Sequence, residues 1–107
     1  MPYDTYNFPD HEKDDTYEGT TFTVLVNDVA LDLTDAVIQA KFWKNAFTYT
    51  FSTTTGELTL VDAANGVFML DEQIITFNSG TYCHKFTFWL ISGDVKTYIK
   101  GTWKITR

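Results

Sequence analysis

Hydrophobic and polar residues alternate with a period of two along most of the chain after residue 19. Because successive side chains of a β-strand point to opposite faces, this period predicts strands with one buried face. A helix over 34–44 fits less well, since the β-branched and aromatic residues of that segment prefer strands. Residues 71–77 are ambiguous and suit a loop that crosses between two sheets. The predicted strands are 20–26, 29–33, 36–43, 47–52, 58–61, 67–70, 81–92 and 95–106.

The last two predicted strands flank Gly93-Asp94, a two-residue loop of the kind that closes tight hairpins. Placing Ser92 opposite Val95 puts most of the aromatic residues of 81–92 on one face and three lysines of 95–106 on the other. A slip by one residue would bury those lysines, so the pattern favours this register. The expected core face consists of Tyr82, His84, Phe86, Phe88, Leu90, Thr97, Ile99, Gly101, Trp103 and Ile105.

The same register sets Trp89 opposite Tyr98 on the lysine-bearing face and Gly101 opposite Phe86 on the core face. An exposed aromatic pair of this kind can stack on a sugar ring or form the hot spot of a protein interface. Trp43, on another predicted strand, is the third candidate for surface binding. The alternative is that this face packs against the N-terminal segment or a neighbouring strand.

The spacing of turns indicates the fold class. Five of the six glycines fall at predicted turns or strand starts, so turns recur roughly every 10 to 15 residues, as in β-sandwiches and barrels. Seven or eight antiparallel strands in about 90 residues favour an immunoglobulin-like β-sandwich over a barrel. The disulfide and the tryptophan signature of antibody domains are missing from the pattern.

Composition narrows the class of protein further. With 107 residues and 44% hydrophobic residues, the chain suits one domain with a real core. A net charge of −6 argues against binding to nucleic acid or to an anionic membrane, both of which need basic patches. The sequence contains no run of about 18 apolar residues, the length that would predict a membrane-spanning helix. The lone Cys83 cannot form an intrachain disulfide, which suits folding in a reducing cytosol.

The acidic residues are concentrated in residues 1–18, which hold six acids against Lys13, whereas residues 19–107 are nearly neutral. Both prolines also lie in this first segment, which therefore reads as an extended arm ahead of the domain. Two interpretations stay open: a mobile N-terminus, or an arm that orders against a partner subunit. The arm aromatics that would dock are Tyr3, Tyr6, Phe8 and Tyr17.

Candidate catalytic groups are few. His84 falls on the expected core face, where a histidine is more often a hydrogen-bonded core residue than a base. Cys83 falls on the outer face without a histidine beside it. The acidic run around His11 lacks the spacing of a calcium loop. The remaining acids sit at turns and strand ends, as at Glu57 and Asp71. We therefore expect no enzyme, no metal site and no cofactor.

Several short motifs occur in an order that resembles a known family. The chain is similar to the small immunoglobulin-like sandwich proteins encoded among the structural genes of tailed bacteriophages, with Asp35 standing where glycine is common. The motifs are Glu18-Gly19-Thr20-Thr21-Phe22, Asp32-Leu33-Thr34-Asp35-Ala36-Val37-Ile38, Gly66-Val67-Phe68, Gly80-Thr81-Tyr82 and Lys100-Gly101-Thr102-Trp103-Lys104-Ile105.

The resemblance implies a virion component on the head, neck or tail, assembled in the bacterial host cytoplasm. We expect an accessory, decoration or fibre-anchoring subunit that docks on other virion structural proteins through its arm, by strand addition. Unpaired strand edges favour a homo-oligomer, a dimer or trimer. The alternative expectation is a carbohydrate-binding or adhesion module that recognises host-surface glycans through Trp43, Trp89 and Tyr98.

Overall fold

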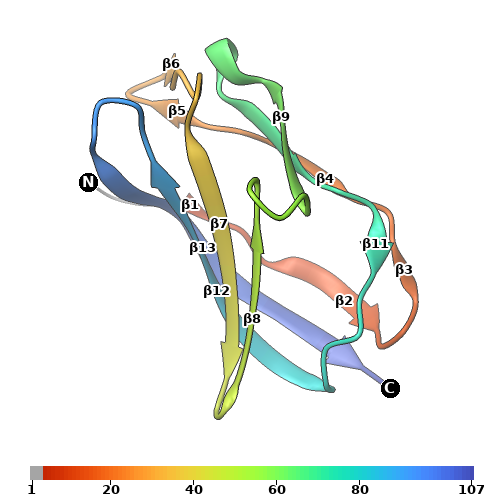
Figure 1. Cartoon of the computed structure of the whole chain (residues 1–107). Coiled ribbons are helices and arrows are strands. Elements are labelled where there is room, and N and C mark those ends of the chain that lie inside the picture. Colours follow the sequence, from red (N-terminus) through yellow and green to blue (C-terminus); the bar gives the residue numbers. More distant parts are fainter. Residues whose placement is uncertain (1–3) are drawn as a thin grey trace.

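Four strands form most of the larger β-sheet in the computed structural model, which describes residues 4–107. They are β7 (Val37–Lys44), β8 (Phe47–Ser52), β12 (Gly80–Trp89) and β13 (Val95–Thr106). The strands lie in the order β13-β12-β7-β8, and all three neighbouring pairs are antiparallel (Figure 1). Buried residues alternate with more exposed ones along most of β7 and β12, which confirms both predicted strands and the expected core face of β12.

The smaller sheet has the order β4-β10-β9 and is also antiparallel. Two short pairs complete the fold, and a 3-10 turn, Ala63–Asn65, precedes β10. Residues 71–77, which were ambiguous in the sequence, supply strand β11 of one pair and bury Ile75 and Phe77. The smaller sheet contains β4 (Thr20–Thr23), β9 (Leu58–Asp62) and β10 (Val67–Leu70), and the short pairs are β3 (Thr16–Tyr17) with β11 (Gln73–Ile74) and β5 (Leu25–Val26) with β6 (Val29–Ala30).

The core lies between the two sheets, an arrangement compatible with a β-sandwich (Figure 1). Phe22 of β4 and Phe68 of β10 face Phe86 and Phe88 of β12. The ring centroids of Phe22 and Phe86 are 5.2 Å apart, and those of Phe68 and Phe88 are 5.6 Å apart. Aromatic pairs at such separations stabilise a core beyond the area that they bury. Many of the aromatic residues of the sequence therefore pack in the core and hold the two sheets together.

The N-terminal segment belongs to the larger sheet of the same chain. Strands β1 (Asp4–Thr5) and β2 (Phe8–Glu12) both pair in parallel with β13. Between them the Tyr6 backbone N–H donates to the Lys100 carbonyl at 2.8 Å, so the contact is nearly continuous. The sequence allowed two interpretations of this segment, a mobile tail or a docking arm. In the structure it adds to the larger sheet of its own chain. Residue 18 is therefore no boundary in the packing.

The close approach of the N-terminal segment explains the glycine inside β13. A Cβ built on Gly101 would lie 1.8 Å from the Tyr6 carbonyl oxygen, so no larger residue fits without moving backbone. The same carbonyl lies 2.8 Å from Nε2 of His84, which stands opposite Gly101 on β12. The sequence placed Phe86 opposite Gly101; that pairing is wrong, and Phe86 stands opposite Ile99.

Trp103 anchors the other half of the N-terminal segment. Its indole N–H donates to the Pro9 carbonyl at 3.0 Å, and its ring stacks on Phe8 with centroids 4.6 Å apart. Tyr17 closes the cluster at 5.2 Å from Trp103. Trp103 is completely buried, and Phe8 and Tyr17 are 4% and 9% exposed. Burial of large aromatic side chains of this kind contributes strongly to folding.

The predicted register of the β12–β13 hairpin is wrong. It differs from the observed register by two residues between Gly80 and Phe86, and by three between Thr87 and Trp89. Val95 stands opposite Trp89 instead of Ser92, and the connection runs from Leu90 to Asp94, closed by a bond from the Leu90 N–H to the Asp94 carbonyl at 2.9 Å. A shift of two keeps every side chain on its expected face, so the core face at residues 82–88 and 99–105 is confirmed. The third residue of the shift comes from a bulge after Phe86, where Tyr98 of β13 has no residue opposite it on β12.

We predict that Gly101→Ala destabilises the protein by more than about 2 kcal/mol, because overpacking against fixed backbone is costly. Gly56→Ala is the control, since its Cβ meets nothing within 4 Å and only its positive φ of 93° is unfavourable, at about 1 kcal/mol. Urea unfolding measures both. Equal losses in the two variants would contradict the close contact between residues 4–12 and β13.

Candidate functional site

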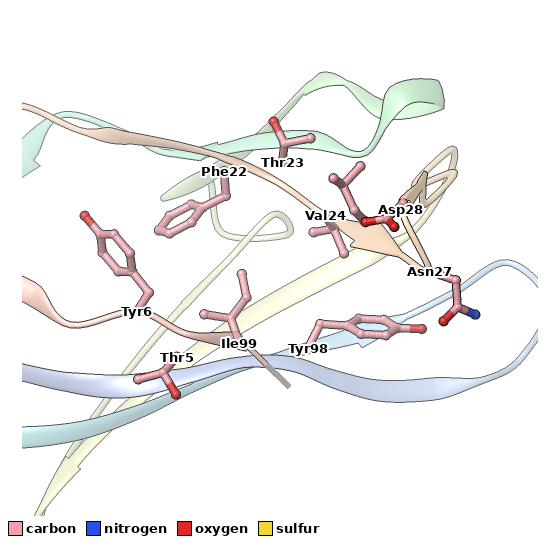
Figure 2. Close-up of a pocket in the computed structure, with 10 residues that line it drawn as sticks. Thr5, Tyr6, Phe22, Thr23, Val24, Asn27, Asp28, Tyr98 and Ile99 are labelled. Atoms are coloured by element: carbon pink, nitrogen blue, oxygen red, sulfur yellow. The ribbon is translucent and has the colours of Figure 1, made fainter. Parts of the chain in front are cut away.

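A groove opens between the two sheets along one flank of the molecule, with a volume of about 640 Å³. It lies between β4 and β5 on one side and β1 and β13 on the other (Figure 2). Tyr6 and Phe22 lie at one end, and Asn27 and Asp28 lie at the other (Figure 2). The groove therefore has a mixed polar and apolar lining, with one acidic end. Its lining residues are Thr5, Tyr6, Phe22, Thr23, Val24, Leu25, Asn27, Asp28, Tyr98 and Ile99.

Tyr98 lies in this groove and not on the outer face. The bulge in β13 turns its side chain inward, where it packs on Phe88 with centroids 5.3 Å apart and is 8% exposed. Burial, with a smaller contribution from the Asp94 carboxylate, raises the pKa of Tyr98. The predicted pair with Trp89 is therefore wrong, because a bulge reverses the face of the residues beyond it.

Trp89 is exposed at the end of the larger sheet. It stands opposite Val37 on one side and Val95 on the other, and all three side chains are partly exposed. Trp43 stands on β7 opposite Cys83, six residues along β12 from Trp89 and hence roughly 20 Å away. The three predicted surface aromatics thus occupy three separate places.

Trp43 borders a shallow hollow of about 270 Å³ on the outer face of the larger sheet. Lys41 lies two residues before it on the same strand, and Lys85 stands opposite Lys41 on β12. Asn45 of the β7–β8 turn and Thr48 of β8 complete the lining. Neither lysine is a binding candidate in the sequence pattern, although acidic residues are absent from 37–44, 80–89 and 95–106.

The predicted arm aromatics separate into different environments. Phe8 and Tyr17 are buried in the core of their own chain, and Tyr6 is half-buried beside the groove. Burial, opposed by a hydrogen bond from Thr20, raises the pKa of Tyr17 to about 12. Tyr3 lies outside the described residues. Docking through all four aromatics would require Phe8 and Tyr17 to leave this core.

His84 is a buried core histidine, as the sequence indicated. It is 1% exposed, and its Nε2 donates to the Tyr6 carbonyl, while Nδ1 has no hydrogen-bond partner among the described residues. Phe8 and Phe42 pack around the ring at 5.1 and 5.7 Å. Burial lowers the pKa of His84, and the bond to Tyr6 opposes this only in part. The neutral ring therefore holds the N-terminal segment.

Acidic residues at turns carry local structural bonds. Glu57 accepts from the Ser52 N–H at 3.2 Å, and Asp71 accepts from the Thr59 hydroxyl at 2.8 Å. Asp32 accepts from the backbone N–H of Thr34 at 2.9 Å, and bonds from Thr34 lower the pKa of Asp32. These contacts agree with the turn interpretation of such residues.

We predict that acid weakens the fold through His84. Because its pKa is lower folded than unfolded, the unfolded chain binds an extra proton below about pH 6.5, and stability falls as the pH drops further. The slope reaches at most about 1.4 kcal/mol per pH unit. His84→Gln, whose amide can still donate to Tyr6, should flatten it. Urea unfolding at pH 7.5, 6.5 and 5.5 measures this, and equal pH dependence in both proteins would contradict it.

No three His, Cys, Asp or Glu side chains within residues 4–107 are grouped so that they could hold a metal ion. In the same described range, no helix has the length and apolarity needed to cross a membrane. No protein-family model, curated protein or solved structure matches the chain.

Proposed function

We propose that this protein is an immunoglobulin-like structural module of a bacteriophage particle that acts by binding other virion proteins. The strand order supports the fold assignment. Immunoglobulin sandwiches place strands C′, C, F and G in one sheet and B, E and D in the other. The orders β8-β7-β12-β13 and β4-β10-β9 correspond to these two sheets.

Tyr82 supports the same assignment. It lies near the start of β12, and its hydroxyl donates to the Asn78 carbonyl at 2.7 Å. Immunoglobulin domains carry a tyrosine corner of this kind at the start of strand F, two residues before the second cysteine. Here His84 stands two residues after Tyr82, at the position of that cysteine, and its bond goes to Tyr6 beside the same sheet instead of across to β4.

The observation that carries the binding role is the groove between the edges of the two sheets. Strand β4 has no partner on its outer side among the described residues. The Val24 N–H donates to the Gly66 carbonyl, which precedes β10, and N–H directions alternate, so the Thr23 N–H points to the open edge. An extended segment laid in the groove would gain backbone bonds to β4 and apolar contacts with Tyr6, Phe22 and Ile99.

We therefore propose that the chain accepts a strand from a neighbouring virion protein. This keeps the strand-addition mode expected from the sequence but reverses the roles, since the N-terminal segment is paired within its own chain. The unpaired edges of β4, β8 and β9 also support a homo-oligomer, a dimer or trimer, which sedimentation equilibrium measures. Asp28 at one end of the groove favours a donor segment that carries a basic residue there.

A mass-spectrometric inventory of particles tests the assignment. Particles from the organism that encodes this sequence are purified on density gradients, and the chain is expected in the particle fraction at a fixed ratio to the major shell protein. Absence of the chain from intact particles would overturn the virion role.

We predict that Thr23→Pro lowers incorporation into particles roughly tenfold, because proline removes an N–H that the added strand would use. Thr50→Pro is the matched control: β8 is also an edge strand, and by the same alternation the Thr50 N–H points away from β7. Proline is tolerated at such positions, so both variants should fold. Equal incorporation of the two variants would refute the groove as the docking site.

A second candidate function is glycan binding, and one observation favours it. Trp43 borders a hollow on the outer face, and an indole ring is a common platform for sugars. Trp89 and Tyr98 lie elsewhere, so a shared platform of three aromatics is not the basis of this candidate.

A further inference from the structure

Four strands of the larger sheet are cationic although the protein is acidic, and the acidic strands β1 and β2 pair only with β13 at its edge. The four strands β7, β8, β12 and β13 contain six lysines and no aspartate or glutamate, so all 14 acidic residues of the chain lie elsewhere. Alternation places Lys41, Lys85, Lys100 and Lys104 on the outer face, whereas Lys44 and Lys96 fall on the core side of their strands. The net charge of −6 thus conceals a positive outer face on these strands. A face of one sign draws ligands of the opposite sign to itself.

Three of these lysines stand in one row across neighbouring strands. Lys85 of β12 is directly opposite Lys41 of β7 and directly opposite Lys100 of β13. Like charges at opposed positions destabilise a sheet, and Lys85 is also half-buried. Neither Lys41 nor Lys85 forms an ion pair within residues 4–107. An anion placed between them would remove this repulsion.

The hollow beside Trp43 adjoins this row and fits a small ligand. Its volume of about 270 Å³ lies just below the usual range for ligand pockets, so it suits a single ring better than an element of another protein. Trp43 offers a partly exposed aromatic surface, Lys41 and Lys85 offer charge, and Asn45 and Thr48 offer polar side chains. These are the groups that bind a sugar ring, an acidic substituent and hydroxyls.

We propose that this hollow is a binding site for a sugar that carries an acidic group, a carboxylate, sulfate or phosphate. The ring stacks on Trp43, and the acidic group lies between Lys41 and Lys85. Asn45 and Thr48 bind the ring hydroxyls. The proposal specifies the ligand of the glycan-binding candidate and rests on it. It is independent of the virion assignment, because the hollow and the edge groove share no residue.

Nuclear magnetic resonance titration of the full chain tests the site. Methyl β-glucuronide should shift the Trp43 indole N–H resonance, whereas methyl β-glucoside, which lacks the carboxylate, should bind at least about tenfold more weakly. Trp43→Ala, followed through the backbone amide resonances of Lys41 and Thr48 because the indole is removed, should abolish glucuronide binding. Trp89→Ala, which removes a tryptophan from the same face, should leave binding unchanged. Lys41→Gln combined with Lys85→Gln should erase the preference for glucuronide.

The outcomes separate the alternatives. Glucose 6-phosphate and glucose 6-sulfate show which acidic group binds best, and the tightest of the three acids defines the ligand. Equal binding of glucuronide and glucoside would overturn the role of the lysines. If none of the acidic sugars shifts Trp43 while a decaglutamate peptide does, the face binds an acidic protein and the sugar proposal is wrong. A folded Trp43→Ala protein that still binds glucuronide would also overturn it.

Discussion

The pairing of residues 4–12 with β13 is the contact on which the rest of this structure depends. It covers Trp103, supplies Phe8 to the core and closes one edge of the larger sheet. The pairing needs a backbone position without a side chain, which Gly101 provides, and a donor for the Tyr6 carbonyl, which His84 provides. A buried carbonyl without such a donor would cost much of what the pairing contributes.

The same contact forms part of the groove and determines where the acidic residues of the segment lie relative to the lysine row. Because the N-terminal segment lies along β13, its Tyr6 forms one end of the groove beside β4. The segment also carries acidic residues such as Asp10 and Glu12 to the margin of the larger sheet, beyond the lysine row. The acidic and basic parts of the chain thereby become separate surfaces of one domain. Separated charges of this kind direct partners of opposite sign to different faces.

The hairpin of β12 and β13 shows which features the alternation of hydrophobic and polar residues predicts and which it does not. Alternation placed Tyr82, Phe86 and Trp103 on the core face correctly, because a register error of two residues leaves each side chain on its face. The pattern failed at Tyr98, since a bulge exchanges the faces and leaves no mark in hydrophobicity when the residue is an aromatic that suits either side. The predicted two-residue loop was also wrong, because Gly93-Asp94 forms part of a longer connection.

The sequence by itself determined that the chain is all-β, which side chains of most long strands are buried, and that its acidic residues avoid those strands. These are local properties, and a period of two expresses them directly. Only the tertiary structure decided that the N-terminal segment pairs with β13, that three lysines stand in one row, and that Tyr98 turns into a groove. Each of these depends on contacts between residues far apart in the chain, whose register is decided by backbone geometry and close packing and not by composition.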